Sequence, residues 1–234
     1  MSEETATHLL STYGRPQDFS SVVLHPSGGG LGQYVGLIAA LSRRGAVHGI
    51  RASGLRTGEL PDERVADMTD RYLPVLRSLP NRPDLLVGWS LGGVLAWELA
   101  VALATDDYRP AVVMLDSFAE PWSACADDPG RQAVLRKIVE EAAPAADQEG
   151  RDRVLRTATA HIAASVGHQV KSRYEGPVLL MPGNSAERTR QISDWSARAP
   201  FLRTSPLDCG HFEIFERENL RGLLRNLENF LLHS

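Results

Sequence analysis

The stretch from Asp84 to Ala100, which reads DLLVGWSLGGVLAWELA, constrains the fold more than any other part of this chain. Three apolar residues lead into Gly-Trp-Ser-Leu-Gly-Gly, and a helix-forming segment follows at once. The pattern predicts a strand, a sharp turn with Ser90 at its apex, and a helix. A serine on such a strained turn needs neighbours without Cβ atoms, and Gly88 and Gly92 meet that need. We therefore expect the Ser90 hydroxyl to project above a sheet, beside the positive end of the following helix.

Length and composition fit a single globular domain, which we place at residues 1–234. Hydrophobic residues make up 43% of the chain and charged residues 23%, as in ordinary soluble proteins. The net charge of -4 gives no reason to expect a nucleic-acid partner. Cys125 and Cys209 are the only cysteines, so we expect neither a disulfide framework nor a metal site, and a cytoplasmic location is the simplest.

No targeting or membrane segment is predicted. The first ten residues, MSEETATHLL, lack the basic region and the long apolar region of a signal peptide. Residues 85–104 are apolar enough to suggest a membrane span, but Ser90, Glu98 and the paired glycines lie inside this stretch. A buried strand followed by a buried helix explains it better, so we expect no membrane partner.

Apolar runs and helical patterns alternate along most of the chain, after a polar lead-in over residues 1–19. Strands are predicted at residues 21–25, 46–50, 85–88, 111–115, 177–181 and 201–205. Helices are predicted near residues 31–44, 61–79, 131–142, 151–170 and 188–197, directly after Ser90, and at the end of the chain. This alternation predicts an α/β fold whose mostly parallel sheet is flanked by helices on both faces.

Between residues 117 and 174 the alternation stops, and two helical patterns appear without a convincing strand. In the second pattern Leu155, Ala158, Ile162 and Val166 recur at helical spacing. We interpret residues 117–174 as a helical lid inserted over the carboxyl edge of the sheet, where open α/β folds bind their ligands. This stretch is called the lid segment below.

A serine hydroxyl is a poor nucleophile at neutral pH and needs a base, normally a histidine held by a carboxylate. Among seven histidines, His211 is favoured because it lies in a glycine-containing turn after the last predicted strand. His25 closes the first strand, and we expect it to shape the loop that follows. Surface or core positions are expected for the others, which are His8, His48, His161, His168 and His233.

Asp116 is the favoured carboxylate, because it ends the apolar strand that follows the nucleophile strand. Burying an unpaired carboxylate is costly, so an acid at this place needs a partner. Helix capping is the structural alternative. The rival position is the loop after residues 177–181, where Glu187 is the only acid and should begin a helix. The order Ser90, Asp116, His211 is the one that α/β-hydrolases use.

Acyl transfer also needs donors directed at the developing oxyanion. The backbone N–H of Leu91, just after the nucleophile, is the first candidate. The second is the N–H of Ser27, followed by that of Gly28, in the glycine-rich loop after the first strand. A phosphate-binding loop is disfavoured, because the lysine and the hydroxyl residue of a P-loop are absent.

With these residues placed, the chain resembles the thioesterase domains of nonribosomal peptide and polyketide synthetases over nearly its whole length. Residues 25–29 (HPSGG) are similar to the opening H-P-[AS]-G-G of that family, and residues 88–93 (GWSLGG) match its G-[WY]-S-x-G-G. Residues 49–55 (GIRASGL) resemble its Y-G-[LI]-x-A-x-G-L segment. Residues 115–117 and 210–212 resemble the positions of its catalytic acid and of its histidine turn.

The resemblance implies a seven-stranded α/β-hydrolase core with a mobile helical lid. It implies a substrate carried as an acyl or peptidyl thioester on the phosphopantetheine arm of a carrier protein, with no resident cofactor. Ser90 would take the chain as an ester, and water or a nucleophile within the chain would release an acid, lactone or lactam. The lid segment would bind the substrate and meet the carrier protein.

Two neighbouring activities stay open. Stand-alone editing (type II) thioesterases resemble the chain closely but carry the acid in the later loop, near Ala186 here, and the choice of Asp116 therefore favours a product-releasing enzyme. A general carboxylesterase on the same fold is the other enzymatic alternative. A noncatalytic acyl-binding module is disfavoured by the intact Ser90, Asp116 and His211. The chain is expected to be either a synthetase's terminal domain or a free-standing releasing enzyme.

Overall fold

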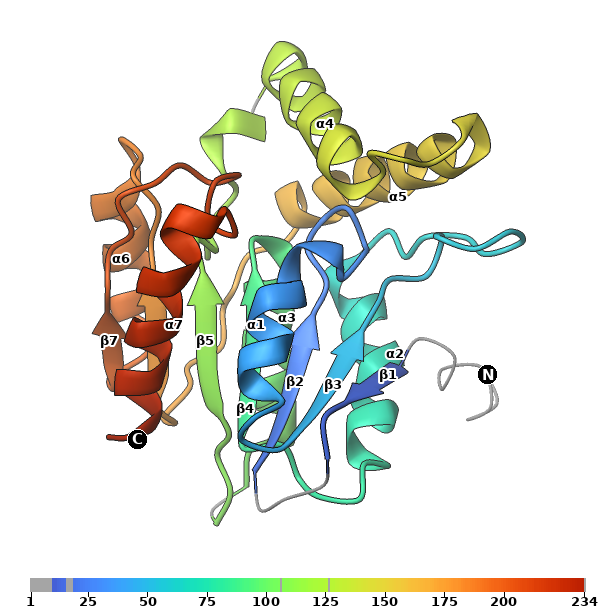
Figure 1. Cartoon of the computed structure of the whole chain (residues 1–234). Helices are drawn as coiled ribbons and strands as arrows, with labels where there is room; N and C mark the ends of the chain where they lie inside the picture. The colour runs from blue at the N-terminus through green and yellow to red at the C-terminus, as the bar shows by residue number, and fades with distance from the viewer. Residues whose placement is uncertain (1–9, 16–18, 106, 126, 234) are drawn as a thin grey trace.

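A mostly parallel sheet forms the centre of the molecule in this computed structural model, which describes residues 10–15, 19–105, 107–125 and 127–233 (Figure 1). Its seven strands lie in the order β1-β3-β2-β4-β5-β6-β7. The strands are β1 (Leu10–Tyr13), β2 (Ser20–Leu24), β3 (Ala46–Ile50), β4 (Leu85–Trp89), β5 (Ala111–Leu115), β6 (Val178–Met181) and β7 (Leu202–Thr204). This arrangement confirms the α/β fold that the alternation predicts.

Strand β1 corrects the sequence prediction, which treats residues 1–19 as a loosely held lead-in. Leu10 to Tyr13 pairs antiparallel with β3, with Leu10 opposite Ile50. Three of its four residues are exposed, and an exposed edge strand carries little of the apolar pattern that reveals buried strands. The rest of the predicted lead-in, residues 1–9 and 16–18, lies outside the described residues.

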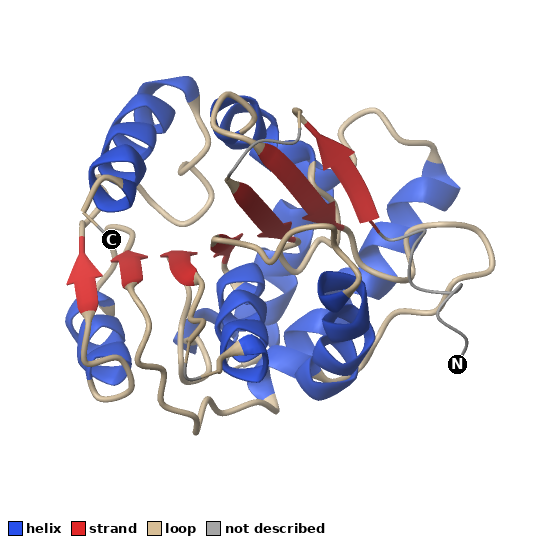
Figure 2. Ribbon diagram, turned by 90° about the horizontal axis from the view of Figure 1, so that it is seen from below, coloured by secondary structure: helices blue, strands red, loops and turns tan. Residues whose placement is uncertain are grey.

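Alternate residues of the buried strands pack into a hydrophobic core on each face of the sheet. Val22, Leu86 and Val112 pack on one face of the sheet with α2 and α3. Their neighbours Val23 and Val87 pack on the other face with α1 and α7. Figure 2 shows the resulting layers, with the strands in the middle and helices on both sides. Near-continuous apolar strands thus reflect burial on both faces.

The helices occupy the predicted places with shifted ends. They are α1 (Val35–Leu41), α2 (Val65–Arg77), α3 (Leu91–Leu103), α4 (Asp128–Ala142), α5 (Gln148–Val166), α6 (Arg188–Ser196) and α7 (Arg217–Leu231). Two short 3-10 helices, η3 (Gly32–Tyr34) and η4 (Ser123–Cys125), precede α1 and α4. The prediction that α2 begins near Pro61 is wrong. The chain from Arg51 to Arg64 instead forms a loop fastened by the Arg51–Glu59 ion pair at 2.6 Å.

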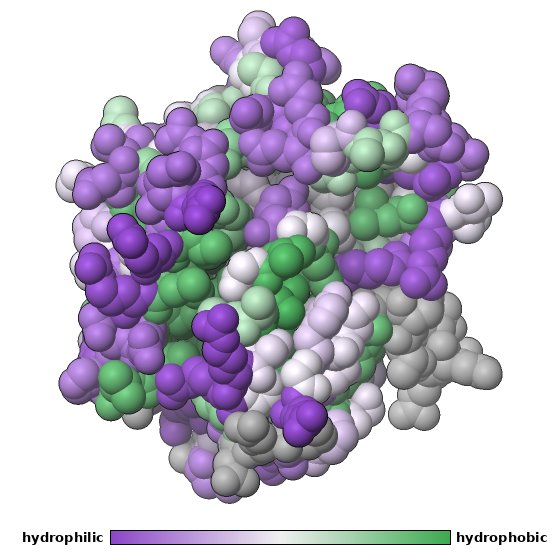
Figure 3. Space-filling view, viewed as in Figure 1, coloured by the Kyte–Doolittle hydropathy of each residue, from purple (hydrophilic) through white to green (hydrophobic). Residues whose placement is uncertain are grey.

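Helices α4 and α5 of the lid segment lie over the carboxyl ends of the central strands (Figure 1). Ala158 and Ile162 are buried as the helical spacing indicates, but Leu155 and Val166 are exposed. Val154 and His161 are buried in their place, so the buried face of α5 is rotated from the predicted one. Hydrophilic residues dominate the outer surface around α4, whereas hydrophobic residues are visible between α1 and α7 (Figure 3).

Within the described part of the chain, no helix combines the length and the apolar character that crossing a membrane would require.

Candidate active site

Ser90 lies at the apex of a tight turn between β4 and α3. Its backbone has φ 58° and ψ -124°, and its N–H donates to the carbonyl of Leu115 on the neighbouring strand at 2.9 Å. A Cβ atom on Gly88 would lie 2.0 Å from the carbonyl carbon of Gly92. One on Gly92 would lie 2.4 Å from the Leu24 carbonyl oxygen. The glycines that the motif requires are therefore the ones that let strand, turn and helix approach each other.

Backbone strain is concentrated at two of the predicted site residues. In the described residues, Ser90 and Asp116 are the two non-glycine residues with positive φ, at 58° and 43°. Such conformations cost on the order of 1–3 kcal/mol each and persist only where the surrounding structure enforces them. Their coincidence with a predicted nucleophile and a predicted acid favours a functional role for this edge of the sheet.

Gly88→Ala should lower the free energy of unfolding by about 3 kcal/mol or more, because its methyl group would overlap the backbone of Gly92. Chemical denaturation measures the change. Gly222→Ala on α7 is the matched control. The added methyl group would project into open space, and replacing a helical glycine with alanine should raise stability by about 0.5–1 kcal/mol. A Gly88→Ala protein within about 1 kcal/mol of the native one would contradict this picture of the turn.

Asp116 follows β5 directly and is buried. Its Oδ2 accepts from His211 Nδ1 at 2.8 Å, and its Oδ1 accepts from the Gly183 N–H at 2.8 Å and from Gln191 Nε2 at 3.1 Å. Burial works to raise the pKa of the Asp116 carboxyl. The hydrogen bonds, led by the one from His211, outweigh it, so the pKa lies below its usual value. Asp116 is thus placed as a charged hydrogen-bond partner of His211, rather than as a helix cap.

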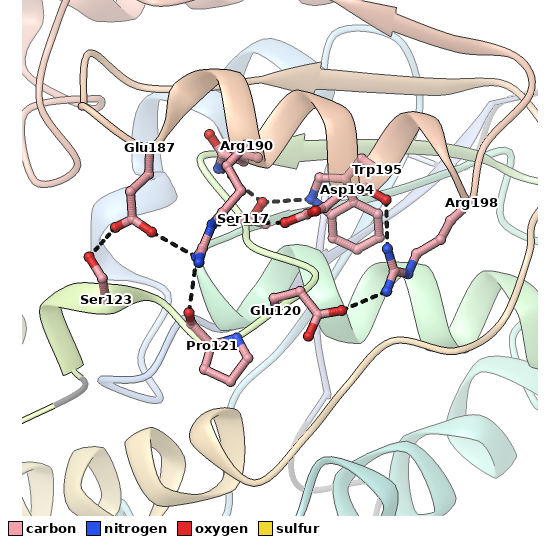
Figure 4. Close-up of polar contacts among 10 residues, drawn as sticks. Ser117, Glu120, Pro121, Ser123, Glu187, Arg190, Asp194, Trp195 and Arg198 are labelled. Atoms are coloured by element: carbon pink, nitrogen blue, oxygen red, sulfur yellow. Dashed lines mark hydrogen bonds and ion pairs between the residues drawn. The ribbon is translucent and has the colours of Figure 1, made fainter.

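Glu187, the rival acid, is engaged elsewhere. It accepts a hydrogen bond from the Ser123 hydroxyl and pairs with Arg190 at 2.7 Å, as Figure 4 shows. Both contacts belong to a network between α6 and the start of the lid segment, in which Arg198 also pairs with Glu120 at 2.7 Å. The structure therefore places Asp116, and not Glu187, against His211.

His211 lies in the turn between β7 and α7, as the sequence predicts. Its imidazole packs between the rings of Trp89 and Trp122, with centroid separations of 5.1 Å and 4.6 Å. In the described part of the chain, His211 hydrogen-bonds to Asp116 and not to Ser90. Contacts of this kind often tighten only when substrate binds. The aromatic packing and the Asp116 contact fix the orientation of the ring.

One cavity brings the predicted residues together. It is lined by Ser90, His211, Leu91 and Ser27, and Val134, Ile138, Ile162 and Val166 of α4 and α5 cover it. Its walls are largely apolar, with Trp89, Phe118 and Phe212 around the serine. An apolar cavity partly covered by lid helices, with a few convergent polar groups, suits a substrate with an apolar chain.

The two predicted oxyanion donors border this cavity from different elements. Leu91 is the first residue of α3, so its N–H has no partner within the helix and lies at the positive end of the helix dipole. The Ser27 N–H, in the loop after β2, makes no hydrogen bond within the described part of the chain. A substrate oxygen held between the two would be stabilised as it gains charge.

Two buried histidines lie behind the Ser27 loop. His25 Nδ1 donates to the Pro26 carbonyl at 2.9 Å, and its Nε2 accepts from the Tyr72 hydroxyl at 2.7 Å. This contact accounts for the predicted role of His25 in shaping the loop. His161, on α5, stacks on His25 at 5.1 Å and donates from Nδ1 to the Ser27 carbonyl at 2.9 Å. The sequence offered no signal for this contact, because 134 residues separate its partners.

These histidines should make the protein sensitive to acid. Burial lowers the pKa of His25 to about 3 and that of His161 to about 4. The unfolded chain binds these protons near pH 6.5 whereas the folded protein does not, so stability falls as the pH drops below 6.5. At pH 4.5 each histidine should cost about 2–3 kcal/mol relative to neutral pH. Denaturation at both pH values tests this, and an equally large decline in His161→Asn would contradict it.

Comparison with known proteins identifies a family. A family model described as a thioesterase domain matches residues 22–231. Vanchrobactin synthetase VabF of Vibrio anguillarum is 25% identical over 217 residues, which cover 86% of this chain and 8% of that protein. The chain spans only 5% to 9% of the length of three of its curated relatives.

Solved structures share the fold. The NocB thioesterase domain from the nocardicin cluster has a TM-score of 0.77 at 23% identity, covering 96% of this chain and 99% of that one. The type II thioesterase BorB from the borrelidin biosynthetic cluster has a TM-score of 0.74 at 20% identity, covering 95% and 97%. The same core therefore occurs in a thioesterase domain and in a type II thioesterase.

Proposed function

Because this chain belongs to the thioesterase domain family, we propose that it is a serine thioesterase that releases an acyl or peptidyl chain from the phosphopantetheine arm of a carrier protein. The observation that carries the proposal is the 2.8 Å contact between the buried Asp116 and His211, whose imidazole lines the same cavity as Ser90. A serine at a strained strand-to-helix turn beside an oriented imidazole is the arrangement that acyl transfer requires.

In the first half of the reaction, Ser90 Oγ attacks the thioester carbon while His211 Nε2 takes its proton. The oxygen of the tetrahedral intermediate is held by the N–H groups of Leu91 and Ser27. The C–S bond then breaks, and the phosphopantetheine sulfur leaves as a thiol with the proton from His211. Asp116 keeps the imidazole in the tautomer that can accept at Nε2 and stabilises the imidazolium.

In the second half, His211 removes a proton from the incoming nucleophile, which attacks the Ser90 ester. Collapse of the second intermediate breaks the ester bond and returns the proton to Ser90. Water gives the free acid, whereas a hydroxyl or amine within the chain gives a lactone or lactam. Macrocyclisation and hydrolysis therefore use the same residues and differ in which nucleophile the cavity admits.

A specific observation keeps the editing thioesterase as a second candidate. The cavity volume is about 80 Å³, well below the roughly 300–1,000 Å³ of typical ligand sites. A short acyl group fits such a space with the lid segment in place, whereas a peptidyl chain requires α4 and α5 to move. Hydrolysis rates for acetyl, longer acyl and peptidyl pantetheine thioesters separate the candidates, because an editing enzyme should favour the shortest chain.

The proposed thioesterase activity is tested by comparing an acyl phosphopantetheine thioester with the matching oxygen ester. We expect a much higher kcat/KM for the thioester, and a further increase when a carrier protein presents it. An equal or greater kcat/KM for the simple ester, unaffected by a carrier protein, would favour a general carboxylesterase instead. No hydrolysis of either by a folded protein would argue for a noncatalytic module.

A further inference from the structure

His161 links the lid segment to the loop that carries an oxyanion donor. It lies on α5, it is completely buried, and its Nδ1 is 2.9 Å from the carbonyl oxygen of Ser27. A carbonyl oxygen only accepts hydrogen bonds, so the proton of the imidazole is on Nδ1. His161 Nε2 is buried with no hydrogen-bond partner, and Nδ1 therefore makes the one polar contact of this ring in the described structure.

The contacts of the two histidines act on two consecutive peptide groups. The peptide between Pro26 and Ser27 has its carbonyl held by His25 Nδ1 at 2.9 Å and by the Gly29 N–H at 2.8 Å. The next peptide, between Ser27 and Gly28, has its carbonyl held by His161. In a trans peptide the N–H points away from the carbonyl, so fixing these carbonyl groups fixes the directions of the Ser27 and Gly28 N–H groups.

The two histidines also support each other. Their rings stack with centroids 5.1 Å apart and an interplanar angle of 20°. His25 is held from the core side by the Tyr72 hydroxyl at 2.7 Å, whereas His161 comes from the lid segment. A side chain of α5 thus completes a support that begins on α2, behind a loop facing the cavity.

We propose that His161 is a positioning residue, which makes correct orientation of the N–H donors in the Ser27–Gly28 loop depend on the docking of α5. With α5 in place, the Ser27–Gly28 peptide is held and the N–H groups are directed for catalysis. When α5 moves away, the Ser27 carbonyl loses its hydrogen bond from His161, and His25 loses the ring that stacks on it. The hydrogen bonds from this loop to the transition state therefore reach their full strength only when the lid segment has closed over the substrate. The inference rests on the proposed thioesterase function.

Three replacements separate the hydrogen bond from the bulk of the ring. His161→Asn retains an N–H donor close to the position of Nδ1, whereas His161→Gln carries its amide near the position of Nε2. His161→Phe keeps a ring against His25 but has no donor. Thr159→Ala, on the exposed side of α5, is the control variant.

The readouts are the rate of acyl-enzyme formation from a pantetheine thioester and the affinity for a boronic acid, which forms a tetrahedral adduct with a serine. His161→Phe and His161→Gln should lower both by about 10- to 100-fold, since removing an oxyanion donor outright costs about 10²–10³. Affinity for the unreactive pantetheine amide should stay unchanged. His161→Asn and Thr159→Ala should remain within about threefold of the native protein on the same scale.

Several results would overturn the inference. One is a folded His161→Gln or His161→Phe protein that acylates at the native rate. Another is an equal loss in His161→Asn and His161→Gln, which would indicate general damage to the packing; thermal unfolding of each variant shows whether this has occurred. If His161→Phe does not fold, the difference in acylation rate between His161→Asn and His161→Gln still tests the inference. A native protein that forms no acyl-enzyme would instead refute the proposed function.

Discussion

Ser90→Ala should reduce thioester turnover by on the order of 10⁶, because serine, base and acid act as a unit and no other group can take their place. The variant should fold like the native protein. The turn depends on Gly88 and Gly92 and on the hydrogen bond from the Ser90 N–H to Leu115, all of which alanine leaves intact. Steady-state hydrolysis of an acyl pantetheine thioester, together with thermal unfolding, checks both statements.

Ser193→Ala is the matched control, because Ser193 is an exposed serine on α6, outside the cavity. It should hydrolyse the thioester at the native rate. A Ser90→Ala protein that retains more than about one per cent of the native turnover would show that Ser90 is not the nucleophile, since loss of a triad nucleophile leaves far less.

Asp116→Asn should lower turnover by about 10⁴ with little change in stability. An asparagine amide facing His211 Nδ1 would favour the tautomer whose proton is on Nε2, and that nitrogen could then no longer accept the proton of Ser90. Stabilisation of the imidazolium would also be lost. The loss should appear in the rate of acyl-enzyme formation, and the affinity for the substrate, measured separately, should stay unchanged.

Glu187→Gln serves as the comparison, since Glu187 contacts Ser123 and Arg190 and not the imidazole. Losing an ion pair at the protein surface should change turnover by less than about threefold. If Glu187→Gln were the damaging variant and Asp116→Asn remained active, the assignment of the acid to the end of β5 would be wrong.

Much of the fold was predictable because burial on both faces leaves a direct trace in the sequence. Strands such as β4 and β5 are continuous apolar runs, and Gly88 and Gly92 mark the turn between β4 and α3. Strand β1 escaped prediction because three of its four residues are exposed and its pairing with β3 is a long-range contact. The start of α2 was misplaced because Pro61 suits a loop as well as a first helical turn.

The candidate site was predictable where the chemistry is local and not where it depends on distant contacts. Ser90, Asp116 and His211 each follow a predicted strand, and parallel strands bring their carboxyl ends to one edge. The Gly183 and Gln191 contacts that lower the pKa of Asp116, and the aromatic packing around His211, depend on tertiary structure. The contact between His161 and Ser27 also depends on tertiary structure, and no sequence pattern predicts it.

The central claim is that Ser90 carries the acyl chain as an ester during turnover. The most direct measurement is rapid mixing with an acyl pantetheine thioester, acid quenching, proteolysis and mass spectrometry of the peptides. The account predicts that the mass of the acyl group appears on the peptide containing Ser90, and that it is absent in Ser90→Ala. An active native enzyme whose acyl group lies on another residue, or that shows no covalent adduct at any quench time, would contradict it.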